Sequence, residues 1–217
     1  MKKFAVVLAG CGTLDGAEIH EATLLLLAIK KAGASYEIFA PDIPQYYVIN
    51  HITGEEMPEK RNIMVEAARI ARGKIKEIDT FCPDQFDVLA FPGGTGFTKN
   101  MCNFAFKGAE CEVHPKISRA ILKMAETKKP IAAMCIAPVA LARVLNNVQI
   151  TLGAEPSKAV DAIKKMGARH IPSTHGEVVY DEKYNVFTTP SYMLDASITD
   201  VAEGADKLVA AILSHLG

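Results

Sequence analysis

Short apolar runs alternate with amphipathic stretches along the whole chain. Continuous apolar runs are typical of buried strands, and apolar positions three and four residues apart predict helices. The first pair shows this pattern, with a predicted strand at 4–9 and a predicted helix at 17–32 that Gly33 follows. Further strands are predicted at 36–40, 87–91, 131–134 and 148–152, further helices at 62–72, 114–128, 137–145, 156–166 and 192–216, and a hairpin of two strands at 177–180 and 186–189.

Alternating strands and helices with short connections predict an α/β fold of the doubly wound kind, in which helices cover both faces of a mostly parallel sheet. No repeat or low-complexity linker divides the chain, so we expect a single domain over 1–217. The irregular segment 41–61 is the one long insertion. We expect it to cover the rim of a site or to form an interface.

Composition narrows the class of protein. Hydrophobic residues make up 49% and charged residues 23%, as in soluble globular proteins. The formal net charge is −1 and no basic stripe is present, which argues against nucleic acid as a partner. No apolar stretch is long enough to span a membrane, and Gly10-Cys11-Gly12 interrupts the N-terminal run too early for a signal peptide. The five cysteines form no C-x-x-C pair and no zinc-binding pattern, which predicts reduced thiols, no metal and a cytoplasmic location.

Cys135 lies at the predicted corner between the strand at 131–134 and the helix at 137–145, among small residues. Ligands of doubly wound sheets bind beyond the carboxyl ends of the strands. A thiol at such a tight turn fits a nucleophile, because the following helix is expected to lower its pKa and the Ile136 N–H can bind an oxyanion. The same spacing also fits a small buried core cysteine, so spacing alone leaves both interpretations open.

Two further segments contain groups that could act together with the Cys135 thiol. Gly93-Gly94 follows the strand at 87–91, where glycines let backbone N–H groups approach a ligand, and Gly94 would be the second oxyanion donor. Glu21, early in the first helix, could exchange a proton with the thiol. An ordinary turn at Gly93-Gly94 and a solvated carboxylate at Glu21 are the alternatives. No phosphate-binding loop or dinucleotide fingerprint is complete, so no cofactor is predicted.

Taken together, these segments resemble the PfpI superfamily and, within it, the ElbB family, also called sigma cross-reacting or enhancing-lycopene-biosynthesis proteins. The resemblance covers nearly the whole chain. The residues that carry it are 9–12, 15–22, 48–51, 61–62, 66–73, 91–94, 99–100, 132–138 and 188–190.

The resemblance implies a flavodoxin-like sandwich with the class I glutamine amidotransferase-like fold, commonly as a homodimer. It implies Cys135 as nucleophile, Glu21 as its carboxylic partner, and an oxyanion hole made by the N–H groups of Gly94 and Ile136. It also implies a weak, glutathione-independent glyoxalase activity, a hydro-lyase reaction that converts glyoxal or methylglyoxal to a hydroxy acid without metal or organic cofactor. An auxiliary role in isoprenoid metabolism is associated with the same family.

The chain departs from the peptidase-like members of the superfamily directly after the nucleophile, where Ile136 replaces their histidine. His170 and His175 are the later candidates for a triad, and neither lies in a triad pattern. These differences argue against a peptidase or a glutamine amidotransferase.

Four more residues complete the predicted oxyanion and substrate-binding set. Gly93 belongs to the glycine turn, and Asn100 to a segment that carries the resemblance. His20 is interpreted as a pocket-wall or interface residue, because its neighbour Glu21 points about 100° away around the helix. Cys11 is either a second thiol near the site or a packing residue. Cys82, Cys102 and Cys111 are assigned no role, while Asn50 and His51 are placed at the mouth of the site.

Two other functions compete with the enzyme. A reactive thiol would also suit a redox sensor or stress-protection protein, since exposed thiolates oxidise readily. A scaffold that keeps the fold without the chemistry is the second alternative.

Overall fold

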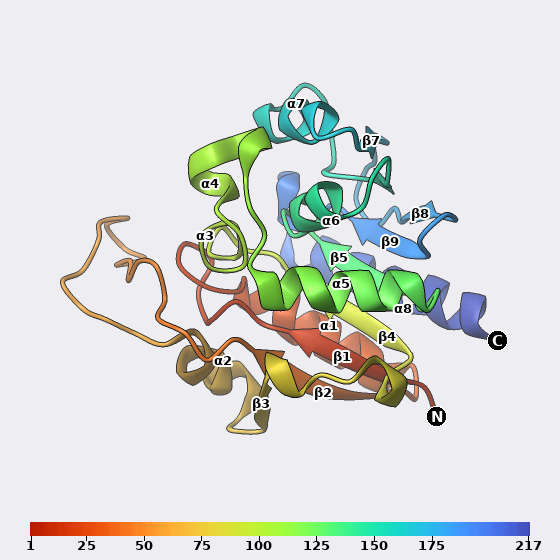
Figure 1. Cartoon of the computed structure of the whole chain (residues 1–217), viewed down its shortest axis with the longest axis horizontal. Coiled ribbons are helices and arrows are strands. Elements are labelled where there is room, and N and C mark those ends of the chain that lie inside the picture. Colours follow the sequence, from red (N-terminus) through yellow and green to blue (C-terminus); the bar gives the residue numbers. More distant parts are fainter.

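Seven strands form the central sheet, in the order β3-β2-β1-β4-β5-β9-β8, in a computed structural model that describes all residues 1–217 (Figure 1). All neighbouring strands are parallel except β8, which pairs antiparallel with β9. The mostly parallel sheet and its terminal hairpin are thereby confirmed. The strands are β1 (Lys3–Val7), β2 (Ser35–Ala40), β3 (Ile75–Glu77), β4 (Val88–Phe91), β5 (Ile131–Met134), β8 (Val179–Asp181) and β9 (Val186–Thr189).

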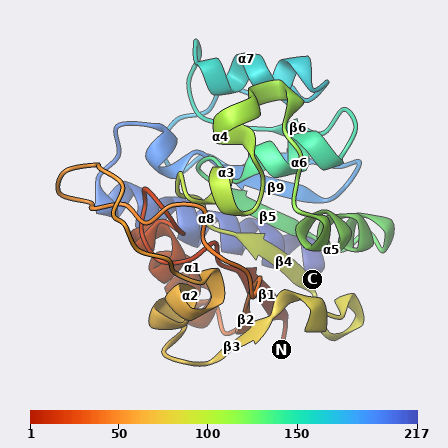
Figure 2. The same ribbon diagram turned by 60° about the vertical axis from the view of Figure 1, so that its left-hand side comes forward.

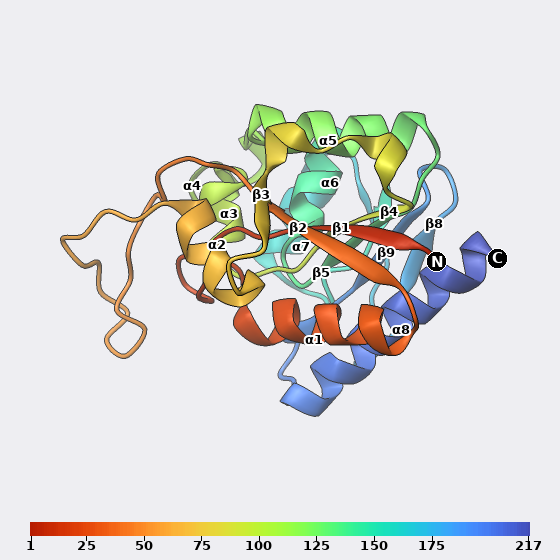
Figure 3. The same ribbon diagram turned by 90° about the horizontal axis from the view of Figure 1, so that it is seen from below.

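Helices cover both faces of this sheet, as Figure 3 shows. The long helices α1 (Ile19–Lys31) and α8 (Ile198–Leu216) pack against each other on one face, and α5 (Pro115–Glu126) and α6 (Pro138–Val144) cover the other. The doubly wound, flavodoxin-like α/β fold is therefore confirmed. The remaining helices are α2 (Ile63–Ala71), α3 (Phe97–Asn100), α4 (Phe104–Lys107) and α7 (Lys158–Lys165).

The sheet reverses its direction of winding between β1 and β4, which places the ligand-binding crevice. From β1 the chain builds outward through β2 and β3, and it then returns to add β4 and β5 on the other side of β1. Ligands of such sheets bind at this switch point, beyond the carboxyl ends of the strands. Figure 2 shows α1 and α3 at that end of the sheet.

One contiguous cluster of 59 buried residues forms the core. Every residue of β4 and β5 is buried, because helices lie against both faces of these central strands. The loops that follow β4 and β5 therefore start from a rigid support.

Several elements differ from the sequence-based prediction, among them the short helices α3 and α4, which were not predicted. The last helix starts at Ile198 and not at 192, since Ser197 and Asp200 form a capping box at its N-terminus. The strand predicted at 148–152 shortens to β6 (Gln149–Ile150), which pairs with β7 (Arg169–His170) in a separate two-stranded sheet. The edge strand β3 was not predicted, because lysine and glutamate follow its single apolar residue and leave no apolar run.

Residues 41–61 contain no helix or extended strand, and Figures 1 and 3 show the segment projecting from the body of the molecule. Isolated bridges between Ile49 and Glu56 and between Pro44 and Asn62 hold its two arms together. None of the helices combines the length and apolar character needed to cross a bilayer.

Candidate active site

Cys135 occupies a strained turn directly after β5. Its φ of 57° lies in the left-handed region, which non-glycine residues adopt at a cost. Two hydrogen bonds hold this turn: the Cys135 N–H donates to the carbonyl oxygen of Thr189 at 3.1 Å, and the Ala137 N–H donates to that of Met134 at 3.0 Å. The sharp corner between strand and helix is therefore present, and the thiol residue is 7% exposed.

Glu21, in the first turn of α1, is fully buried. The Gly93 N–H donates to its Oε2 at 2.8 Å, and the Tyr192 N–H donates to its Oε1 at 3.4 Å. The Glu21 backbone N–H in turn donates to the carboxylate of Glu18, the N-cap of the helix, at 2.7 Å. Two loops from the other side of the switch point thus hold the Glu21 carboxyl in one orientation.

Gly93 brings Glu21 and Cys135 together. A Cβ atom at this position would lie 2.6 Å from the Cys135 Cβ and 2.9 Å from the Glu21 Oε2. Both distances are shorter than van der Waals contact, so only glycine fits between the two side chains. The thiol and the carboxyl, which come from elements far apart in the sequence, therefore meet at one point.

Burial raises the pKa of both members of this pair, and Glu21 raises that of Cys135 further. Burial raises the pKa of Glu21 to about 7, with a contribution from the Glu18 carboxylate; the thiol of Cys135 and the N–H groups of Gly93 and Tyr192 act in the opposite direction. Burial, followed by the charge and hydrogen bonding of Glu21, raises the pKa of Cys135. Two anions at this contact are unfavourable, so the pair keeps a proton at neutral pH.

The expectation of a lowered thiol pKa was wrong. The N–H groups of Gly94 and Ile136 do lower the pKa of Cys135 by hydrogen bonding, but burial and Glu21 outweigh them. These two N–H groups are the ones expected from the sequence as oxyanion donors, and both lie close enough to the sulfur to affect its pKa. A substrate oxygen on a carbon bound to this sulfur would come within their reach.

Glu18 and Tyr192 are functional neighbours that the sequence analysis missed. Glu18 raises the pKa of Glu21, and Tyr192 binds its carboxyl through the backbone. The Tyr192 hydroxyl also lies 2.8 Å from Nδ1 of His20, which is exposed, so His20 is close to the site without contacting the thiol directly. The role of Tyr192 was missed because the sequence pattern predicted a helix from residue 192, although Pro190 just before it indicates a turn.

Two predicted binding residues have other surroundings. The charged groups that shift the pKa of Cys11 are Glu66, Arg69 and Asp15, and neither Glu21 nor Cys135 is among them. The Asn100 amide nitrogen donates to the carbonyl oxygens of Ala9 and Asp15, at 2.9 Å each. Its Oδ1 accepts the N–H of Tyr46 at 3.0 Å. Asn100 therefore has no amide hydrogen left for a substrate, and we assign it to the support of the loops.

Neither of the two histidines considered for a triad is among the groups that shift the pKa of Cys135 or Glu21. The His170 ring is fully buried, accepts the Leu152 N–H at Nε2 and pairs with Glu155 at 2.7 Å through Nδ1. His175 is exposed. His51 lies beside Leu14 and Asp15, where its Nε2 accepts the Leu14 N–H at 3.2 Å.

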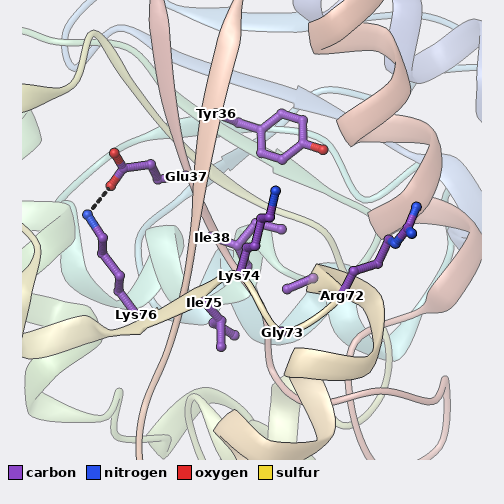
Figure 4. A pocket seen from close by; sticks show the side chains of 9 residues that line it. Tyr36, Glu37, Ile38, Arg72, Gly73, Lys74, Ile75 and Lys76 are labelled. Atoms are coloured by element: carbon purple, nitrogen blue, oxygen red, sulfur yellow. Dashed lines mark hydrogen bonds and ion pairs between the residues drawn. The ribbon is translucent and has the colours of Figure 1, made fainter.

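A surface hollow of about 710 Å³ lies at the β2–β3 edge and contains none of these groups. Figure 4 shows Tyr36, Lys74 and Arg72 around it, with Lys76 paired to Glu37. No three His, Cys, Asp or Glu side chains gather in a way that could hold a metal ion. The thiol, the carboxyl and the backbone N–H groups described above lie at the switch point, away from the β2–β3 edge.

Comparison with known proteins places this chain in a family. No protein-family model matches the chain. The human glutamine amidotransferase-like class 1 domain-containing protein 3, mitochondrial, is 38% identical over 99% of this chain and 84% of its own length. The structure of an isoprenoid biosynthesis protein with an amidotransferase-like domain from Ehrlichia chaffeensis superposes with a TM-score of 0.91 at 33% identity, over 98% of this chain and 99% of that one. A ThiJ/PfpI domain protein from Brachyspira murdochii shares the fold, with a TM-score of 0.62 at 15% identity over 100% and 98% of the two chains. The chain has the class I glutamine amidotransferase-like fold and belongs to the family of glutamine amidotransferase-like class 1 domain-containing proteins.

Proposed function

We propose that this protein is a cofactor-independent, glutathione-independent lyase of the glyoxalase type that converts small dicarbonyls, such as glyoxal and methylglyoxal, to hydroxy acids. One observation carries the proposal: the Cys135 thiol and the Glu21 carboxyl meet in a buried site beside two backbone donors. A carboxyl with a pKa of about 7 can both accept and donate a proton at neutral pH.

The first step forms a carbon–sulfur bond. Glu21 takes the proton of the Cys135 thiol while the sulfur attacks the aldehyde carbon, so the thiol needs no lowered pKa beforehand. The aldehyde oxygen becomes an alkoxide, which the N–H groups of Gly94 and Ile136 stabilise. Return of the proton to this oxygen gives a hemithioacetal.

The next steps move a proton between carbons. Glu21 removes the hydrogen of the former aldehyde carbon as a proton and returns it to the adjacent carbon through an enediol, which leaves a thioester of the 2-hydroxy acid. Water then attacks the thioester carbon, the carbon–sulfur bond breaks, and the thiol regains its proton. One carbon is oxidised and its neighbour reduced, so the reaction consumes one water and needs no external oxidant or reductant.

Steady-state turnover of methylglyoxal by wild type, Cys135→Ser and Glu21→Gln tests this function. We expect hydroxy acid from the wild type and at least a 100-fold loss in both variants. Cys82→Ser is the matched control, because Cys82 lies in the loop before β4, at the opposite end of that strand from Gly93. Equal turnover by wild type and Cys135→Ser would refute the proposal.

A thiol-based redox sensor is less well supported, because the Cys135 thiol is buried and its pKa is raised. Mass measurement after mild peroxide separates the two functions. Oxidation of Cys135 to a sulfinate in a protein that turns over no dicarbonyl would favour the sensor.

An auxiliary role in isoprenoid metabolism is the second candidate. It is favoured by the similarity to the Ehrlichia protein, which is named an isoprenoid biosynthesis protein. The ElbB resemblance points the same way. Isoprenoid levels in a strain that carries Cys135→Ser would show whether the thiol serves this role.

Two further predictions concern assembly and location. A homodimer is expected from the family resemblance, and sedimentation of the purified chain measures it. A cytoplasmic location stays a prediction for this chain, and cell fractionation measures it; the human relative is named mitochondrial.

A further inference from the structure

Ser191 lies in the loop that holds the catalytic pair, directly after β9. Thr189, two residues before it, accepts the Cys135 N–H at 3.1 Å. Tyr192, one residue after it, donates its N–H to Glu21 Oε1 at 3.4 Å. Ser191 therefore sits between a backbone contact to the thiol residue and a backbone contact to the carboxyl.

Its backbone conformation is unfavourable for a serine. The φ of 45° lies in the left-handed region, where glycine would carry no strain. The turn is fixed by the Met193 N–H, which donates to the Pro190 carbonyl oxygen at 2.9 Å, and by the Leu194 N–H, which donates to that of Ser191 at 3.2 Å. Strain of this kind is concentrated at functional sites, where the surrounding structure maintains it.

The Ser191 hydroxyl is also unpaired. The residue is 6% exposed, and its Oγ has no hydrogen-bonding partner in the protein. A buried hydroxyl without a partner lowers stability, whereas alanine or glycine here would avoid that loss. Neither the strain nor the side chain therefore serves the fold, and both are explained if the hydroxyl binds a ligand oxygen.

We propose that the Ser191 hydroxyl is a specificity-determining group that hydrogen-bonds the second oxygen of a 1,2-dicarbonyl substrate. The inference rests on the proposed function. The N–H groups of Gly94 and Ile136 bind the oxygen on the carbon that Cys135 attacks. The oxygen on the next carbon is then left without a hydrogen-bonding partner. A hydroxyl both donates and accepts, so it fits this oxygen as a ketone and, after proton transfer, as an alcohol. A simple aldehyde has no second oxygen and gains nothing from Ser191.

The test compares methylglyoxal with propanal in wild type, Ser191→Ala and Ser191→Gly. Alanine removes the hydroxyl and keeps the backbone strain, whereas glycine removes both. For each aldehyde, the concentration that half-protects Cys135 from iodoacetamide is measured by peptide mass. The kcat and KM for methylglyoxal are measured in parallel.

We expect both variants to bind methylglyoxal about 3- to 10-fold more weakly, as the loss of one neutral hydrogen bond implies, with propanal changed less than twofold. Wild-type binding of methylglyoxal by both variants would overturn the role of Ser191. Equal losses of affinity for the two aldehydes would also overturn it, because they indicate a general effect on the loop. A wild type that binds both aldehydes at Cys135 without turnover would refute the glyoxalase function and leave the selectivity measurement valid. A wild type that binds neither would refute both.

Discussion

The backbone N–H of Gly93 donates a hydrogen bond of 2.8 Å to Oε2 of Glu21, 72 positions earlier in the chain. The same glycine packs against the Cys135 side chain so closely that a Cβ atom would overlap it. One residue thus orients the carboxyl through its N–H and admits the thiol through its missing side chain. The catalytic proposal depends on both properties.

Gly93→Ala tests this double role. The added methyl would lie 2.6 Å from the Cys135 Cβ and force the thiol and the carboxyl apart. We expect a loss of about 1–3 kcal/mol in the free energy of unfolding and roughly 100-fold lower turnover of methylglyoxal. Gly54→Ala is the control for turnover, because a Cβ there meets nothing within 4 Å; its φ of 75° means that alanine costs some stability at this position too. Wild-type turnover by Gly93→Ala would show that the close contact is unimportant.

Glu18→Gln should move the pH profile of the reaction. The Glu18 carboxylate raises the pKa of Glu21, so its removal lowers that pKa from about 7. Glutamine keeps an oxygen to accept the Glu21 N–H, which preserves the N-cap. The rise of kcat/KM with pH that follows ionisation of Glu21 is expected at lower pH in the variant. An unmoved profile would exclude Glu18 as a determinant of the Glu21 pKa.

Glu21→Gln should change how stability depends on pH. Folding raises the pKa of this carboxyl from 4.5 to about 7, so the folded state binds a proton that the unfolded state releases between these values. Wild type therefore loses stability as pH rises through this window, by up to about 3 kcal/mol, and the loss is complete above pH 7. Below the window the carboxyl is protonated in both states.

Urea unfolding at pH 5 and pH 8 measures this effect. From pH 5 to pH 8 the free energy of unfolding is expected to decrease more in wild type than in Glu21→Gln. Glu55→Gln, which removes an exposed carboxyl of the projecting segment, should show the same decrease as wild type. Parallel behaviour of wild type and Glu21→Gln would mean that the carboxyl is not buried in solution.

Asn100→Ala should reduce stability and leave substrate binding unchanged. It deprives two carbonyl oxygens and one N–H of their partner, which costs about 1–3 kcal/mol in the free energy of unfolding. The KM for methylglyoxal should stay within twofold of wild type, because the amide has no free hydrogen for a substrate. Asn100→Asp keeps only the acceptor for the Tyr46 N–H, so this variant should be destabilised as well. A rise in KM without a loss of stability would show instead that Asn100 binds the substrate.

The periodicity of apolar positions was sufficient for the central sheet and its main helices, because buried strands and amphipathic helices leave regular patterns. It failed at β3, whose run is too short and polar, and at residues 192–197, where the capping box at Ser197 delays the start of α8. Local sequence also placed Cys135 at the corner after β5, because a strand, small residues and a helix follow one another there.

Tertiary structure decided what surrounds that thiol. Glu21 meets Gly93 across 72 positions and Tyr192 across 171, and no local pattern encodes such contacts. Burial then reversed the expected direction of the Cys135 pKa, since desolvation depends on what packs over the turn and not on the turn itself. The sequence by itself determined the fold class and the nucleophile's position, whereas packing across the switch point decided its proton partner, its ionisation and the unpaired hydroxyl of Ser191.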